Sequence, residues 1–367
     1  MSSSKEKLIM LAAGGTGGHL FPAIAVAEEL NKHPHVTTHL VTDLRCKDYL
    51  PQDLSTTYHI INIHIKLSGL LNKVFSIANL FNACIKSLLL VGKIKPDIIV
   101  GFGGYPSFPV LLAAKILRIP IIVHEQNCFL GKSNRLFANT AKIIALSYKE
   151  TPNISKYDQK KIIITGDIIR SQISSFKVHY NAHSTLFNIF VVGGSQGAKI
   201  FSTLIPEAIT ELIKLDAKIK DSINIIQQVR KDDYQQLEQH YKRLGIEYEL
   251  SNFFHHMSDI YAKTQLVIAR AGAGTVAELA YTGTPAIFIP LPSAMEDHQF
   301  LNANAIAEAK GGWCYRQKEL NAVSLAHKLY ELINHRSVLE ATSSNLLKRK
   351  QHNASQNFAD TILKIVA

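Results

Sequence analysis

Glycine-rich segments recur at four points along the chain, and each one comes directly after or within a short apolar run. Glycine lets a bound molecule approach the backbone closely, and the uncapped amides of a helix that follows attract anions. We therefore expect loops that bind a phosphorylated ligand; for any single segment, a plain strand-to-helix turn is the alternative. The segments are LAAGGTGGH at 11–19, GFGGYPSFP at 101–109, VVGGSQGA at 191–198 and ARAGAGTVAELAYTG at 269–283.

His19 ends the first segment and is its titratable side chain. Imidazole titrates near neutral pH, so His19 is a candidate general base, with a purely structural histidine as the alternative. The tetrapeptide HEQN at 124–127 also follows an apolar run. Three strand ends in one half of the chain thus carry polar or glycine-rich loops, which favours a site over unrelated turns.

The fourth segment predicts a nucleotide diphosphate site. Its small residues, Gly272 to Thr275, leave the start of a helix uncovered, so a diphosphate can lie against the amides. Glu278 lies one turn further on and can accept hydrogen bonds from ribose hydroxyls; an acid favoured by the helix dipole is the alternative. Gln299 and Asn302 are expected near the same strand ends, and no acidic pair indicates a metal site.

Two other nucleotide motifs are incomplete. Leu20 stands where a GxGxxG dinucleotide motif needs its third glycine, which argues against NAD. The tripeptide at 131–133 is similar to the end of a P-loop, but Gln126 occupies the place of the earlier glycine. ATP hydrolysis of the P-loop type is therefore not expected.

Apolar runs alternate with helical stretches in both halves of the chain, which predicts an α/β fold of two doubly wound parallel sheets. We expect two Rossmann-like domains, joined near 166–184, with the ligand in a cleft between them. Residues 342–367 are expected to be helical. The predicted strands are 8–13, 38–42, 98–101, 119–124, 143–146, 189–192, 223–227, 266–269 and 286–289, and the first two clear helices are 22–31 and 109–117.

Composition agrees with this architecture. A chain of 367 residues, 47% hydrophobic and 19% charged, suits two globular domains and excludes disordered classes. Four cysteines without a CxxC pair predict neither a disulfide framework nor a zinc cluster. No stretch is expected to span a membrane, because the most apolar one, 109–123, contains Lys115 and Arg118.

The formal charge of +11 lies mostly in residues 1–165, and no acid occurs between Asp53 and Asp97. Lysines stand there among apolar residues, which favours an anionic lipid surface over nucleic acid. Within this segment, one helical stripe is expected to face the core: Leu71, Val74, Phe75, Ala78, Phe81, Ile85 and Leu88. The predicted membrane contact comprises Lys73, Ile77, Leu80 and Cys84, aided by Leu70 and Lys86; a helix buried on two sides is the alternative.

Six motifs in this order closely resemble the MurG family, the UDP-N-acetylglucosamine transferases that complete lipid II in bacterial peptidoglycan synthesis. The resemblance extends over residues 14–303. Any one of the motifs alone would be weak, and the set is highly specific. The motifs are GGTGGH, GFGGYPSFP, HEQN, GGSQGA, RAGAGTVAE and DHQFLNA.

The resemblance implies a GT-B fold: an acceptor and membrane-associating domain at 1–165, a UDP-GlcNAc-binding domain at 166–344, and a C-terminal helix at 345–367 that returns to the first domain. It implies inverting, metal-independent transfer of GlcNAc from UDP-GlcNAc to the 4-hydroxyl of MurNAc in lipid I, without a cofactor. It also implies a peripheral location at the cytoplasmic face of the bacterial plasma membrane, with proteins of cell-wall synthesis as partners and no nucleic acid.

Motif by motif, the resemblance also implies residue roles. His19 is the favoured base, and Arg170 neutralises phosphate charge. The junction motif, usually similar to GNPVR, here reads GDIIR at 166–170, so Asp167 replaces an uncharged amide. The remaining substrate contacts are Thr16, Gly17, Gly18 and Asn127 for donor sugar and diphosphate, Ser195 for the donor, Phe254 beside uracil, Ala273, Gly274, Thr275 and Glu278 for phosphate and ribose, and Gln299 for the GlcNAc hydroxyls.

Two other functions are compatible with the motifs. A related UDP-GlcNAc enzyme, either a 2-epimerase or a transferase with a soluble acceptor, would share Glu278 and the nucleotide loops. It would have no use for the lysine-rich apolar segment at 66–95. A non-enzymatic adaptor at a lipid surface or on nucleic acid would have no use for the ordered loops.

Overall fold

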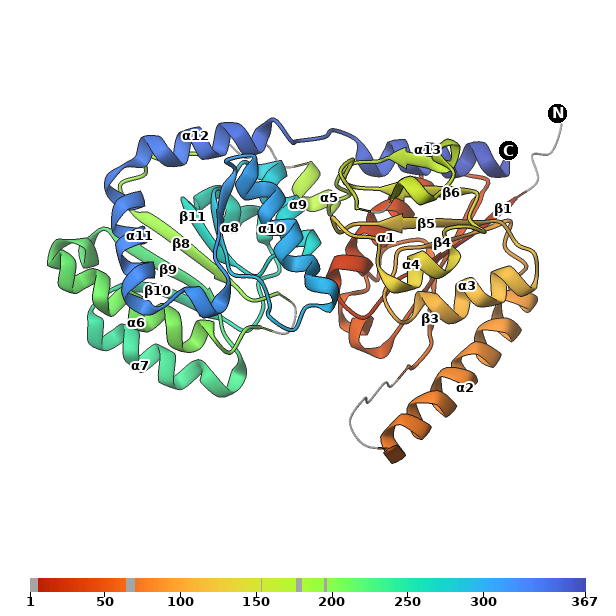
Figure 1. The fold of residues 1–367 in the computed structure, drawn as a ribbon, viewed down its shortest axis with the longest axis horizontal. Helices are drawn as coiled ribbons and strands as arrows, with labels where there is room; N and C mark the ends of the chain where they lie inside the picture. Colours follow the sequence, from red (N-terminus) through yellow and green to blue (C-terminus); the bar gives the residue numbers. More distant parts are fainter. Residues whose placement is uncertain (1–5, 64–69, 153, 176–179, 195–196) are drawn as a thin grey trace. The chain divides into compact units, whose positions relative to one another are not determined.

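The computed structural model describes residues 6–63, 70–152, 154–175, 180–194 and 197–367, and side chains of 70–74 are not described. The chain forms two compact units, one comprising residues 1–170 with 351–367 and the other residues 171–350. The junctions thus lie at 170 and 350, where the sequence analysis expected 165 and 344. The two units are called unit 1 and unit 2 below (Figure 1).

Unit 1 contains a seven-stranded, all-parallel sheet in the order β3-β2-β1-β4-β5-β6-β7. The central strands are mostly apolar because they are buried on both faces, and β5 ends in the buried polar residues His124 and Glu125. The edge strands β3 and β7 were not predicted. The strands are β1 (Lys7–Ala12), β2 (Val36–Thr42), β3 (Thr56–Ile60), β4 (Ile98–Gly101), β5 (Ile121–Glu125), β6 (Ile143–Leu146) and β7 (Ile162–Ile164).

Two layers of helices cover this sheet. Helices α1 (Gly17–Leu30) and α13 (Ala354–Val366) pack together on one face, and α2 (Leu70–Ile94), α3 (Ser107–Ile116) and α4 (Lys132–Phe137) belong to the other (Figure 1). Strand β1 shows the division, because Ile9 and Leu11 face the first layer while Met10 and Ala12 face the second.

The predicted C-terminal helix is two helices. α12 ends at Leu347 in unit 2, and α13 begins at Ala354 in unit 1. Asn353 between them has a left-handed backbone, with φ of 58°, and asparagine is one of the few residues that tolerates this conformation. The prediction of one helix across 345–367 was therefore wrong at the break.

The side of α2 that packs against unit 1 is not the predicted one. Small and β-branched residues are buried, namely Ser76, Ala83, Ser87 and Val91, and their size lets the helix lie close to its neighbours. The predicted core residues Phe75, Phe81 and Ile85 are 73%, 67% and 43% exposed. These three members of the predicted stripe therefore face away from the core. Leu88, also in the stripe, is half-buried and packs against the core, and the side chains of Leu71 and Val74 lie outside the described ones.

Unit 2 contains a six-stranded, all-parallel sheet in the order β10-β9-β8-β11-β12-β13. One face packs against α6 and α11, and the strands β10 and β13 at its edges were not predicted. The strands are β8 (Phe187–Val192), β9 (Ile223–Gln228), β10 (Glu247–Ser251), β11 (Leu266–Ala269), β12 (Ala286–Phe288) and β13 (Gly312–Cys314). The helices are α5 (Ser171–Ser174), α6 (Phe201–Leu215), α7 (Tyr234–Leu244), α8 (Met257–Lys263), α9 (Ala273–Thr282), α10 (His298–Glu308), α11 (Ala322–Asn334) and α12 (Arg336–Leu347).

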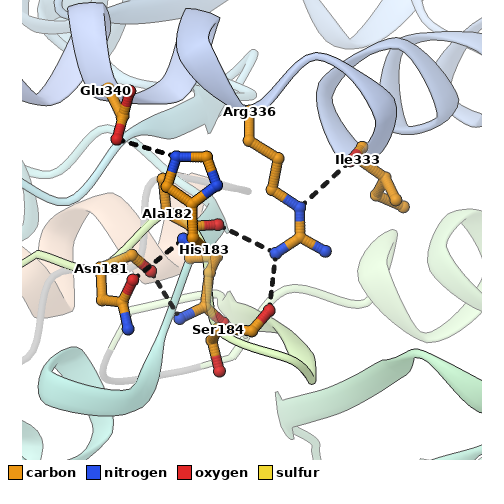
Figure 2. A network of polar contacts seen from close by, with 8 residues as sticks. Asn181, Ala182, His183, Ser184, Ile333, Arg336 and Glu340 are labelled. Atoms are coloured by element: carbon orange, nitrogen blue, oxygen red, sulfur yellow. Dashed lines mark hydrogen bonds and ion pairs between the residues drawn. The ribbon is translucent and has the colours of Figure 1, made fainter.

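Arg336, at the start of α12, ties the segment that leads into β8 to the end of α11 (Figure 2). Its guanidinium donates to the carbonyl oxygens of Ala182 and Ser184, both at 2.9 Å, and to that of Ile333 at 3.1 Å. It also stacks over the ring of Phe187, the first residue of β8. One side chain thus fixes the entry of the chain into β8.

Candidate functional site

The glycine loops follow the two strands at which the order of each sheet reverses. In unit 1 these strands are β1 and β4, with Ala12 paired with Gly101; in unit 2 they are β8 and β11, with Val192 paired with Ala269. Ligands of open parallel sheets bind outside the carboxyl ends of the strands at this switch point. Both units therefore present their glycine loops where the fold places a ligand.

In unit 1 the structure brings His19 against the second glycine loop. His19 lies in the first turn of α1, and its Nδ1 is 3.2 Å from Oγ1 of Thr16. A Cβ atom at Gly103 would lie 3.1 to 3.3 Å from the His19 ring, at Cδ2 and Nε2. The Nε2 edge of His19 therefore borders a residue that has no side chain.

Gly104 must be glycine for two reasons. Its φ is +78°, and a Cβ there would approach the carbonyl oxygen of Gly14 to 2.2 Å. The first two glycine loops thus touch through their backbones. Ser107 fastens the second loop by donating to the Gly104 carbonyl at 2.8 Å, and Ser133 Oγ donates in turn to Ser107 at 3.1 Å.

His124 is a structural histidine. Its Nδ1 accepts from the amide of Gln126 at 3.0 Å, so the ring proton is on Nε2, which faces Thr165 Oγ1 at 3.1 Å. The ring packs between Phe102 and Phe358. Complete burial lowers the pKa of His124 from 6.5 to about 3, so the ring is neutral.

Glu125 organises the loop after β5. It is buried, and its oxygens accept from Gly131 N at 2.8 Å, from the backbone and side-chain amides of Asn127 at 3.1 and 2.9 Å, and from Asn134 at 2.9 Å. Burial raises the pKa of Glu125, and these donors oppose the shift. Asn127, predicted to contact substrate, is thereby held in place.

Arg170 lies next to the first turn of α1. Its guanidinium is 4.6 Å from the centroid of the Phe21 ring, and that ring also lies where a side chain on Gly17 would have to go. Thr16, Gly17 and Gly18 form the start of the same helix, and Thr16 is exposed. The predicted cation and the predicted anion-binding loop therefore meet in unit 1.

In unit 2 the start of α9 is open. Gly272 is the N-cap residue and provides no side-chain cap, and a Cβ there would have no atom within 4 Å. Ala273, Gly274 and Thr275 form the first turn. The amides of this turn are available to an anion, as the sequence analysis expected.

The predicted ribose and uracil residues are linked through two aromatic rings. Glu278 is buried and accepts a 3.0 Å hydrogen bond from the hydroxyl of Tyr261. Tyr261 packs edge-on against Phe190, which packs edge-on against Phe254 with centroids 5.5 Å apart. The predicted nucleotide residues thus belong to one packed cluster.

Gln299 is in the first turn of α10, and its Oε1 accepts from the backbone N–H of Leu291 at 3.0 Å. Asn302, one turn later, is buried and donates to the carbonyl of Ala271 at 3.1 Å, just before the open turn of α9. Ser195 lies outside the described residues.

Three polar residues of the site were not singled out from the sequence. Asn134 holds Glu125, Tyr261 orients Glu278, and Arg270 is buried and donates to the carbonyls of Ile289 and Pro290. Arg270 belongs to the segment at 269–283, and its signal in the sequence is a cation directly after an apolar run. Asn134 and Tyr261 carry no local signal, because their partners are 9 and 17 residues away.

Of the predicted membrane residues, Ile77 is 69% exposed, whereas Leu80 and Cys84 are half-buried. The side chain of Lys73 lies outside the described ones, and Lys86 is exposed. Residues 75–94 are long and apolar enough, by length and composition, to cross a membrane, which the sequence analysis did not expect. One side of this helix, however, contributes Ala83 and Val91 to the core of unit 1.

Comparison with protein families defines the class. Residues 9–146 match the glycosyltransferase family 28 N-terminal domain, and residues 188–361 match the family's C-terminal domain. Together with two Rossmann-like units, these matches make the chain a glycosyltransferase with the GT-B fold. The predicted fold class is confirmed.

A Rickettsia canadensis protein is 45% identical over 360 residues, covering 97% of this chain and all of the relative. It is named UDP-N-acetylglucosamine--N-acetylmuramyl-(pentapeptide) pyrophosphoryl-undecaprenol N-acetylglucosamine transferase. The crystal structure of MurG from Acinetobacter baumannii is 28% identical, with a TM-score of 0.75 and 98% and 99% of the two chains covered. The chain belongs to the MurG family.

A UDP-GlcNAc 2-epimerase from Neisseria meningitidis, solved with UDP-GlcNAc bound, is similar in fold alone. It is 15% identical, with a TM-score of 0.66 over 98% of this chain and all of the other.

Proposed function

We propose that the protein transfers GlcNAc from UDP-GlcNAc to the 4-hydroxyl of MurNAc in lipid I, the undecaprenyl-linked pentapeptide intermediate, and so makes lipid II for peptidoglycan. The main support is full-length similarity to transferases of that name. The structure adds an uncapped helix start beside a buried acid in unit 2 and a histidine among glycines in unit 1.

Unit 2 binds the donor in this proposal. The diphosphate lies against the first amides of α9, Glu278 accepts from the ribose hydroxyls, and Phe254 lies beside uracil. Tyr261 holds one oxygen of Glu278, so the carboxylate is oriented before the nucleotide arrives. Gln299 binds the hydroxyls of the sugar.

His19 of unit 1 is the proposed base. When its Nδ1 carries the ring proton and donates it to Thr16 Oγ1, Nε2 is unprotonated and can accept a proton. The acceptor oxygen attacks the anomeric carbon as the bond to UDP breaks, the hydroxyl proton passes to His19, and UDP leaves with the bonding electrons. Arg170 and the α9 amides offset the charge that develops on the diphosphate.

The exposed apolar side of α2 is the proposed membrane contact. Phe75, Ile77, Phe81 and Leu89 are each 67% exposed or more, and Lys86 and Lys93 lie on the same helix. The opposite side is packed in unit 1, which favours a helix lying on an anionic surface over one that crosses it. In this proposal the enzyme lies peripherally on the cytoplasmic face of the bacterial membrane, where lipid I is presented.

The decisive experiment is transfer of radiolabelled GlcNAc from UDP-GlcNAc to purified lipid I or a short-chain analogue. A radiolabelled disaccharide product supports the proposal. A parallel incubation without acceptor tests epimerisation at C2 of the sugar; epimerisation without transfer would favour the related epimerase. If the folded protein catalyses neither transfer nor epimerisation, the result favours the non-enzymatic adaptor.

A further inference from the structure

The connection between β12 and α10 contains two consecutive residues in an unusual backbone conformation. Glu296 and Asp297 have φ values of 52° and 56°, in the left-handed region that residues other than glycine rarely adopt. Such conformations persist only where surrounding contacts hold them, and they concentrate at ligand sites. Gln299, which is proposed to bind the hydroxyls of the donor sugar, comes two residues after this pair.

Arg316, just after β13, makes two side-chain contacts with this turn and the helix that follows it. Its Nη2 donates to Oδ2 of Asp297 at 2.7 Å, so Arg316 forms an ion pair with one of the two strained residues. The centre of its guanidinium lies 3.7 Å from the centroid of the Phe300 ring, in the first turn of α10. Arg316 thus bridges the residues on either side of Gln299.

The next residue, Gln317, anchors the other end of the same connection. Its Oε1 accepts from Arg270 at 2.8 Å, and Arg270 also donates to the carbonyls of Ile289 and Pro290 at 2.9 and 3.0 Å. Leu291, which follows, donates its N–H to Gln299 Oε1. The segment from 315 to 317 therefore acts on both ends of the connection that carries Gln299.

We propose that Arg316 is a positioning residue for recognition of the donor's N-acetylhexosamine, acting through the Asp297–Phe300 turn that places Gln299. This rests on the proposed function, because Gln299 is taken to contact the sugar. Arg316 affects the sugar end of the nucleotide sugar and leaves the proposed uracil contact at Phe254 and the ribose and diphosphate contacts on α9 intact.

The test compares UDP with UDP-GlcNAc for Arg316→Ala, Arg316→Lys and Asp297→Asn, with Arg243→Ala on α7 as a matched control for loss of an exposed arginine. We expect UDP affinity within about twofold of wild type and a KM for UDP-GlcNAc roughly 5- to 50-fold higher in Arg316→Ala, since small misplacements of a binding group have effects of this size. Arg316→Lys keeps the charge but loses the planar stack, so it should fall between Arg316→Ala and wild type.

Adding Asp297→Asn to Arg316→Ala should change the KM for UDP-GlcNAc little further, because Arg316→Ala already removes the contact with Asp297. An unchanged ratio of UDP-GlcNAc to UDP affinity in folded Arg316→Ala overturns the proposal. An equal loss of affinity for UDP and for UDP-GlcNAc also overturns it, because that result would indicate general damage to unit 2. A wild-type protein that neither transfers GlcNAc nor binds UDP-GlcNAc more tightly than UDP would instead refute the proposed function.

Discussion

The hydroxyl of Tyr261 donates a 3.0 Å hydrogen bond to Oε2 of Glu278, and both side chains are buried. The bond connects α8 to α9 and fixes the plane of the carboxylate. An acid that is already oriented loses less conformational entropy when a ribose binds. Tyr261 thus supports a residue of the proposed nucleotide site, and no spacing in the sequence indicated this contact.

Replacing Glu278 by glutamine should raise the KM for UDP-GlcNAc by the equivalent of about 1.5 to 3 kcal/mol, the usual contribution of a hydrogen bond to a charged group. Glutamine preserves the volume and a partner for Tyr261, whereas alanine would leave that buried hydroxyl without one. The KM in the transfer assay and the Kd from calorimetric titration with UDP-GlcNAc measure the change, with Glu249→Gln at an exposed position of β10 as control. Unaltered affinity in a folded Glu278→Gln protein would remove Glu278 from the site.

Replacing His19 by alanine should lower kcat by roughly 10² to 10⁴, as loss of a general base typically does, with UDP-GlcNAc affinity nearly intact. His35→Ala, at an exposed position of unit 1, controls for loss of a histidine. Turnover close to normal in His19→Ala would contradict the assignment. Loss of both binding and folding would favour a structural histidine.

The stability of unit 1 should fall as the pH decreases from about 6.5. The folded-state pKa of His124 is about 3 and the ordinary value is 6.5, so between these values the unfolded chain binds a proton that the folded chain does not. Stability is therefore fully present above 6.5 and decreases below it by at most ~1.4 kcal/mol per pH unit from this group. Hydrogen exchange of the β5 amides from pH 7 to 5 measures the effect.

The matched variant for this prediction is His124→Gln, which has no titrating group at these pH values. Its exchange-derived stability should change less steeply with pH than that of the wild type. Equal slopes in the two proteins would show that other groups cause the pH dependence.

Replacing Ile77 and Phe81 together by glutamate should weaken sedimentation with anionic liposomes by tenfold or more. Burial of each large apolar side chain contributes about 1.5 to 3 kcal/mol, and the new charges oppose an anionic surface. Transfer to a short-chain soluble acceptor should be unchanged. Val323→Glu on α11, which also replaces an exposed apolar residue, should bind liposomes like wild type.

Full liposome binding by the folded Ile77→Glu, Phe81→Glu protein would place the membrane contact elsewhere. Retained binding to liposomes with loss of transfer to the soluble acceptor would also contradict the proposal, since α2 would then serve the chemistry.

The sequence predicted the central strands and missed the edge ones for a physical reason. Strands such as β4 and β11 are buried on both faces and are therefore continuously apolar. The edge strand β10, with sequence EYELS, is partly exposed and largely polar, and β13 has three residues. Neither the composition of β10 nor the length of β13 distinguishes it from a loop.

Periodicity predicted which apolar residues of α2 share a side, but Phe75, Phe81 and Ile85 are exposed and do not face the core as expected. A helical pattern shows which residues share a side, and it does not show what that side faces. Ser76, Ala83 and Ser87 are too small to stand out in a hydrophobicity pattern, although they are buried. The glycine loops were predictable because a loop at a strand end is a local feature, whereas Asn134 and Arg316 act on residues distant in the sequence.

Phe358 of α13 packs in the core of unit 1 against Phe102 and His124, directly behind two of the loops described above. Translation proceeds from the amino terminus, so the ribosome makes α13 only after all of unit 2. Until α13 is made, the apolar residues of α1 that pack against it and the rings of Phe102 and His124 are not covered by this helix. The first unit to be synthesised is consequently the last to be completed, and a nascent chain halted before Phe358 should expose this surface to chaperones.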